Sequence, residues 1–104
     1  MAGFVQGKLP MEENPSAMAV GVITVGTVAV AGPDVTLARD RAVVLTAEVA
    51  NTASVFVGRS DVATDTGFEI TPGGGLVVTV KNLNALYFIS SVANQKVRYA
   101  VEVA

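Results

Sequence analysis

The 104-residue chain has no cysteine, no histidine and no tryptophan, and these absences remove several kinds of site. Without cysteine there is neither a disulfide nor a thiolate metal site. Without histidine the chain lacks the most common general base and the most common metal ligand. Any catalysis would therefore have to use carboxylates, hydroxyls, Lys, Arg or the two tyrosines. We expect no enzyme activity and no cofactor.

Charge is also scarce, at 15% of residues, and the formal net charge is only -2. The basic residues are scattered along the chain: Lys8, Arg39, Arg41, Arg59, Lys81, Lys96 and Arg98. Because phosphate binding needs clustered Lys and Arg, we expect no nucleic-acid partner. So little charge on a small domain suggests that part of its surface is covered in an assembly, and self-association as a dimer or trimer fits this composition.

The N-terminal sequence does not read as a signal peptide, because Glu12, Glu13 and two prolines precede any apolar run. The apolar run from Ala17 to Gly32 is shorter than the ~20 residues of a membrane-spanning helix, and Thr and Gly interrupt it. We therefore expect no membrane insertion. This run is instead interpreted as one long buried strand or two abutting strands.

Residues 1–18 are predicted to form an extended N-terminal arm, followed by one β-sandwich domain over residues 19–104. Pro10 and Pro15 prevent a continuous helix or a central strand in the arm. Two interpretations remain open: a disordered leader, or an arm that docks on a neighbouring subunit. The second is favoured by apolar residues that a solvated tail would not need, namely Phe4, Val5, Leu9 and Met11.

Beyond the arm, the sequence is rich in Val and Thr and alternates with a period of two, which is typical of strands. Turn residues recur every eight to twelve positions. We predict about eight short strands, in the ranges 20–31, 35–38, 42–50, 55–57, 68–70, 76–81, 86–89 and 96–104. This pattern predicts an all-β sandwich, jelly-roll-like or Ig-like, and leaves a small barrel as an alternative.

The alternation also predicts which residues face the core. The inward set includes Val55, Val57, Phe68, Ile70, Val97, Tyr99, Val101 and Val103. In two further strands the alternation separates the two faces without assigning the inner one: Val43, Leu45, Ala47 and Val49 share one face, and Leu76, Val78 and Val80 alternate with Val77, Thr79 and Lys81. Gly26 is expected to mark a bend or bulge. The segment Pro72–Gly75 leads into a strand and lacks the ending of a phosphate loop, so its glycines are expected to supply positive φ in a turn.

Few residues suggest chemistry. Asp61 and Asp65, with Glu69 as a third acid, could bind Ca²⁺ weakly, but loop Asp and Thr more often bond the local backbone. The same acids as a glycosidase pair would need a deep cleft, which a small sandwich with few aromatics does not offer. Nucleophilic serines would need a base, and the sequence pairs none with Ser54, Ser60, Ser90 or Ser91.

Three pieces of the second half, VFVGRSDV, GFEITPGG and NLNALYFIS, together resemble a pattern found in small structural proteins of tailed bacteriophages. The pattern is V-x-V-G-x-S-x-V, a polar loop, G-F-x-(L/I)-x-P-G, a strand and N-L-x-x-L-Y. Each piece is common by itself, and their order and spacing carry the resemblance. The matching positions are Val55, Val57, Gly58, Ser60, Val62, Gly67, Phe68, Ile70, Pro72, Gly73, Asn82, Leu83, Leu86 and Tyr87.

The resemblance implies a virion component whose motif residues are scaffold and not catalytic. We expect a capsid cement or decoration protein, made in the bacterial cytoplasm and located on the capsid surface. Its partner would be the major capsid protein, contacted through the arm residues Phe4, Leu9 and Met11. The alternative is a tail, fibre or spike module that binds host glycan, which the absence of Trp disfavours.

Overall fold

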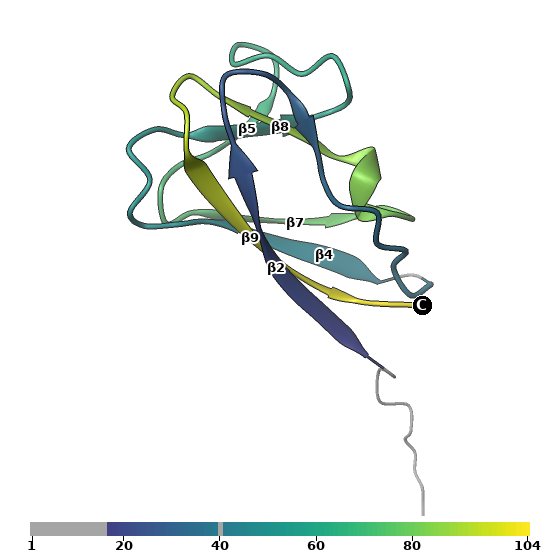
Figure 1. The fold of residues 1–104 in the computed structure, drawn as a ribbon. Coiled ribbons are helices and arrows are strands. Elements are labelled where there is room, and N and C mark those ends of the chain that lie inside the picture. The colour runs from purple at the N-terminus through teal and green to yellow at the C-terminus, as the bar shows by residue number, and fades with distance from the viewer. Residues whose placement is uncertain (1–16, 40) are drawn as a thin grey trace, which may run out of the picture.

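The computed structural model describes residues 17–39 and 41–104, which form two antiparallel sheets of four strands each (Figure 1). We call them the long sheet and the short sheet. The arm residues Phe4, Leu9 and Met11 lie outside the described residues. The long sheet contains, in spatial order, β2 (Met18–Val25), β9 (Gln95–Glu102), β4 (Ala42–Ala47) and β7 (Gly75–Thr79). The short sheet contains β3 (Val30–Ala31), β8 (Tyr87–Ser90), β5 (Val55–Gly58) and β6 (Phe68–Ile70).

The strand pairings identify the fold as a jelly roll. In chain order, the first strand pairs with the eighth, the second with the seventh, the third with the sixth and the fourth with the fifth. This is one long antiparallel hairpin, rolled up so that β4 also pairs β9 and β5 also pairs β8. The predicted all-β sandwich of about eight strands is confirmed, and the pairings select the jelly-roll form over the Ig-like one.

The core lies between the two sheets and follows the predicted alternation. Inward residues of both sheets are fully buried, among them Val25, Val43, Leu45, Ala47, Val55, Phe88 and Val97. Leu83, in the 3-10 helix η1 (Leu83–Ala85), is also fully buried and closes one end of the core. Burial of these apolar side chains is the main favourable term in folding, at about 25 cal/mol for each Å² removed from water.

The apolar run from Ala17 to Gly32 forms two strands in different sheets. β2 belongs to the long sheet and β3 to the short sheet, and the chain crosses between them after Gly26. At the crossing the backbone N–H of Ser90 donates to the Gly26 carbonyl over 2.8 Å. The run is thus neither one long strand nor two abutting strands: residues 26–29 separate β2 from β3, and the even-numbered side chains of β2 are exposed instead of buried. No helix in the described residues is long and apolar enough to cross a membrane.

Three details of the predicted strands are wrong. Residues 35–38 make only isolated bridges, from Thr36 to Asn82 and from Leu37 to Val103, because they fill the space between two strand ends. β4 ends at Ala47, so Val49 lies in a turn and is 83% exposed. Phe68 has the predicted inward parity but is 58% exposed, because β6 is an edge strand where the two sheets part.

Two positions of the resemblance pattern, Asn82 and Gly73, lie in connections where they shape the backbone. Asn82 caps η1, where its side-chain oxygen accepts from the N–H groups of Val35 (3.1 Å) and Asn84 (2.9 Å). The N–H of Gly74 donates to the Thr71 carbonyl over 2.7 Å, and Gly73 has a φ of 82°. These are the features of a type II turn, so the predicted positive φ is confirmed at Gly73.

Candidate interaction surface

The outward residues of the long sheet form an exposed apolar surface, which we call the outer apolar face. Five of its side chains are between 46% and 68% exposed. The strand register aligns four of its residues in one row across the whole sheet: Val20 opposite Ala100, Ala100 opposite Val44, and Val44 opposite Val77. The outer apolar face consists of Met18, Val20, Val22, Val44, Val77 and Ala100.

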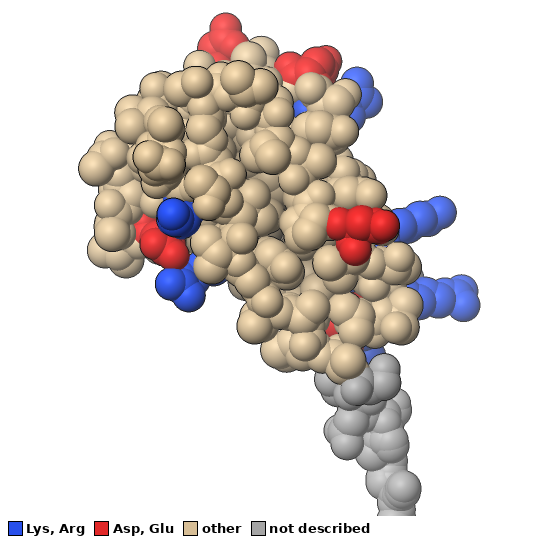
Figure 2. Space-filling view, viewed as in Figure 1, with Lys and Arg blue, Asp and Glu red and all other residues tan. Residues whose placement is uncertain are grey.

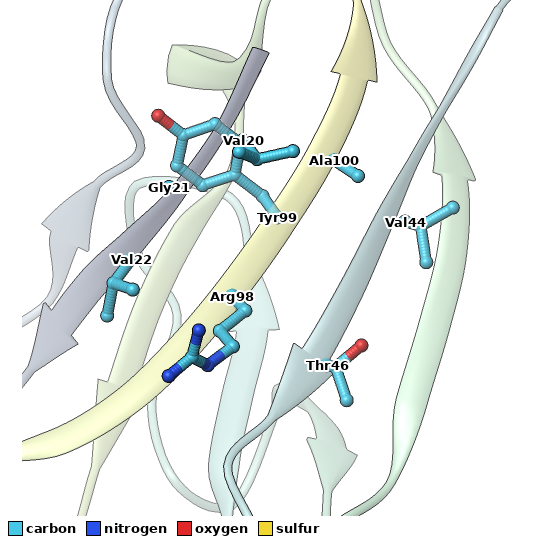
Figure 3. A pocket seen from close by; sticks show the side chains of 8 residues that line it. All are labelled: Val20, Gly21, Val22, Val44, Thr46, Arg98, Tyr99 and Ala100. Atoms are coloured by element: carbon cyan, nitrogen blue, oxygen red, sulfur yellow. The ribbon is translucent and has the colours of Figure 1, made fainter. Parts of the chain in front are cut away.

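A shallow hollow of about 310 Å³ lies on this face, over β2, β9 and β4 (Figure 3). A second row, parallel to the apolar one, contains Val22, Arg98 and Thr46. Gly21 and its partner Tyr99, which have the parity of inward residues, also line this hollow, and the tip of the Tyr99 ring lies against Gly21, where an added Cβ would come within 2.5 Å of the Tyr99 hydroxyl oxygen. Glycine at this position therefore lets an aromatic ring cover the backbone of β2.

Four of the charges that border the outer apolar face form two ion pairs, while Lys96 on the same face, opposite Thr24, is in neither of them. Arg98 Nε lies 3.0 Å from a carboxylate oxygen of Glu48, and Arg41 Nε lies 3.0 Å from one of Glu102. Much of the remaining surface is formed by uncharged residues, as the wide tan areas of Figure 2 show for one view. The two ion pairs add no net charge beside the apolar rows, so most of what this face offers a partner is apolar surface.

The outer face of the short sheet is different, because the loop of residues 59–67 folds over it. Val62 in this loop is only 8% exposed. An added Cβ at Gly58 or at Gly67 would come within 2.8 Å or 2.7 Å of a Val62 methyl group, so both glycines admit this side chain. The loop is held by turn bonds, such as that from the Val62 N–H to the Arg59 carbonyl (2.9 Å). The resemblance stretch thus serves as a cover for its own sheet.

A second apolar opening lies where β6 and β7 part. This groove has a volume of about 480 Å³, and exposed Phe68 forms part of its wall. Arg59 is the only charged residue among the described residues that line it. The remaining walls are apolar or glycine: Val57, Gly58, Leu76, Val78, Val80, Ala85 and Leu86. With no converging polar groups, the groove has no arrangement that would orient a polar substrate.

The structure gives the residues considered for chemistry other contacts. Among the residues that it describes, no three acidic side chains lie close enough together to hold a metal ion. Asp61 and Asp65 are exposed loop residues, and Glu69 accepts a hydrogen bond from the Ser54 hydroxyl over 2.7 Å. The Ser90 hydroxyl donates to the Ser54 carbonyl over 2.8 Å. One of these serine hydroxyls therefore bonds to a carboxylate and the other to the backbone.

Sequence analysis missed the role of Gln95, which is 3% exposed at the start of β9. Its side-chain oxygen accepts from the N–H groups of Thr52 (2.9 Å) and Ala53 (3.0 Å). Its amide nitrogen donates to the Thr52 hydroxyl (3.2 Å) and to the Ala93 carbonyl (3.0 Å). Gln95 therefore fixes the connection between β4 and β5. Nothing local in the sequence distinguishes it from an exposed glutamine.

Comparison with known proteins finds no matching family model, no similar curated protein and no similar solved structure.

Proposed function

We propose that this protein is a structural component of a bacteriophage virion, a cement or decoration protein that binds the outer surface of the capsid shell and stabilises it. The observation that carries the proposal is the outer apolar face. Val20, Ala100, Val44 and Val77 form an apolar row across four strands, and no other described segment covers it. An exposed apolar surface of this kind is typical of a site for protein–protein contact.

In the proposed role, each copy buries this face against the major capsid protein and acts without catalysis. The free energy of binding gained is about 25 cal/mol per Å² of apolar surface buried, less the cost of ordering the groups that bind. Repeated over many copies, this contribution opposes the pressure of the packaged DNA. The jelly roll occurs in viral capsid domains, which supports the proposal, but also in lectins and cupins, so the fold alone does not select the role.

The N-terminal arm is proposed to add a second contact with the shell, through Phe4, Leu9 and Met11. A triple replacement of these residues by serine keeps the chain length and removes their apolar surface. A deletion of residues 1–16 removes all but the last two residues of the predicted arm, 1–18, and stops short of β2, which begins at Met18. We expect both variants to lose binding to capsids and to melt at the temperature of the full-length protein.

The proposal is tested with capsids from the bacteriophage whose genome carries this coding sequence. Purified virions are analysed for the protein by mass spectrometry, and added protein is co-sedimented with capsids that lack it. We expect the wild-type chain to bind, and a Val44→Lys/Val77→Lys variant to bind at least tenfold more weakly while remaining folded. Absence of the protein from purified virions, or unchanged binding by both the arm and face variants, would overturn the proposal.

Host glycan binding is the alternative that a glycan array would reveal. Sugar sites commonly use an exposed aromatic platform. The tip of the Tyr99 ring rests on Gly21 and Tyr87 is half-buried, so the aromatic side chain that could serve as a platform is Phe68, which is 58% exposed. Specific binding to one glycan class, combined with a location at the tail or fibre, would replace the cement role with this one.

A further inference from the structure

The strand β2 lies at an edge of the long sheet and has unusual properties for an edge. It pairs with β9 on one side, and within the described residues no strand pairs with its other side. Its eight residues, MAVGVITV, include no charged residue and no proline, and its register with β9 is unbroken from Met18 to Val25. Natural proteins protect exposed edges by charges, prolines, bulges or very short strands, and β2 has none of these.

The other edges of the two sheets are better protected. β3 has two residues, and β6 has three and includes Glu69. β7 has five residues, begins at Gly75 next to the Pro72–Gly73 turn and is followed shortly by Lys81. β2 is therefore the one long, uncharged edge in the described part of the chain.

The hydrogen bonding shows which backbone groups of β2 face this open edge. The N–H of Val103, just after β9, donates over 3.1 Å to the carbonyl of Ala17, just before β2. Ala17 and Val103 are therefore a hydrogen-bonded pair of the β2–β9 ladder. Such pairs alternate along an antiparallel ladder. Odd-numbered residues thus bond to β9, while Met18, Val20, Val22 and Thr24 direct their N–H and C=O groups to the open edge.

We propose that β2 pairs antiparallel with β2 of a second copy, about a twofold axis, so that two long sheets join into one sheet of eight strands. This goes beyond the proposed capsid role and does not depend on it. Each strand offers the donors and acceptors that an identical strand needs, and no charge opposes the approach. Such a contact is closed and self-complementary, as a twofold dimer requires.

The parity of β2 restricts the register. Side chains of paired residues lie on the same face, so an even-numbered residue must face an even-numbered one; a shift by one residue would turn inward side chains outward. The register with Val20 opposite Val22 of the second copy uses the N–H and C=O groups of all four even residues. It also places Gly21 opposite Gly21 of the second copy, where strands approach to about 4.5 Å. The outer apolar faces of both copies then form one continuous surface.

The first test measures the mass of the full-length protein by light scattering on a sizing column. We expect twice the chain mass of 10.6 kDa. Val22→Pro removes one N–H that faces the open edge and none that bonds β9, so we expect the mass to fall twofold. Val77→Lys, on the same face but at the opposite edge, is the matched control and is expected to leave the dimer intact.

A second variant keeps the proposal testable if Val22→Pro fails to fold. Because the wild-type chain has no cysteine, Val20→Cys/Val22→Cys introduces the only thiols. Under mild oxidation we expect a covalent dimer on a denaturing gel, and none from a Val77→Cys control. A wild-type monomer at every concentration tested would overturn the proposal. So would a dimer that Val77→Lys dissociates, because that result indicates stacking of the faces, or a Val20→Cys/Val22→Cys variant that forms no covalent dimer.

Discussion

The outward apolar residues of one sheet are covered by the chain itself, whereas those of the other sheet are exposed. Both sheets are rich in apolar residues on their outward sides. The short sheet is covered by its own loop, with Val62 buried against Gly58 and Gly67. The long sheet leaves Val20, Val44 and Val77 exposed in one aligned row. The covered face of the short sheet therefore contributes to folding, whereas the open face of the long sheet is available for assembly.

The same contrast holds for the sheet edges. The short sheet ends in strands of two and three residues, which offer few free backbone groups. The long sheet ends in the eight-residue β2 on one side. Both the open face and the open edge therefore belong to the same sheet, and changes there should affect association more than stability. Changes at the covered face should do the reverse.

The largest effect on stability is expected from Val62→Asp. A carboxylate at this buried position loses its hydration, and the exposed Arg59 in the same turn would offset this cost only in part, so we expect a loss of about 3 kcal/mol in the free energy of unfolding. This corresponds to a Tm lower by more than about 10 °C. The matched variant Val77→Asp, on the open face, should cost no more than about 1 kcal/mol, because only strand preference is lost. Denaturant unfolding of the two variants measures both values.

Equal losses for the two variants would contradict the comparison. They would mean either that the loop over the short sheet opens without cost or that Val77 is buried in the protein as it exists in solution. Repeating the unfolding at several protein concentrations separates these cases, since burial by association makes stability depend on concentration.

A smaller loss is expected from Gln95→Met, which keeps the side-chain volume but removes four hydrogen bonds. The N–H groups of Thr52 and Ala53 lose their acceptor, so we expect a cost of about 2 kcal/mol. Because this loop joins β4 in the long sheet to β5 in the short sheet, hydrogen exchange should increase at residues 51–54 before it increases in β2. If Gln95→Met melts like the wild type, the bonds of Gln95 do not hold the sheets together.

Period-two alternation predicted the sheet class and most of the core, because Leu45, Val57 and Val97 are inward residues in strands with clear alternation. It could not show which apolar side of β4 and β7 remains exposed. In stretches such as Ala42–Val44 and Leu76–Val78, both parities are apolar, so the sequence does not distinguish a buried side from an exposed one. The burial of Val62 and of Gln95 depends on contacts with distant segments, which no local pattern encodes.

The smallest effect is expected from the ion pair between Arg98 and Glu48, at the border of the outer apolar face. Arg98 Nε and the Glu48 carboxylate are 3.0 Å apart, but the Arg98 side chain is 65% exposed. Exposed pairs of this kind contribute less than about 1 kcal/mol, and salt screens them. In a double-mutant cycle of Arg98→Ala and Glu48→Ala, we expect a coupling energy below this limit that decreases further as salt is added. A coupling well above it and insensitive to salt would show that the pair is shielded from water, as it would be beneath a bound partner. In that case the measured stability of the fold would include a contribution from the partner bound to the outer apolar face.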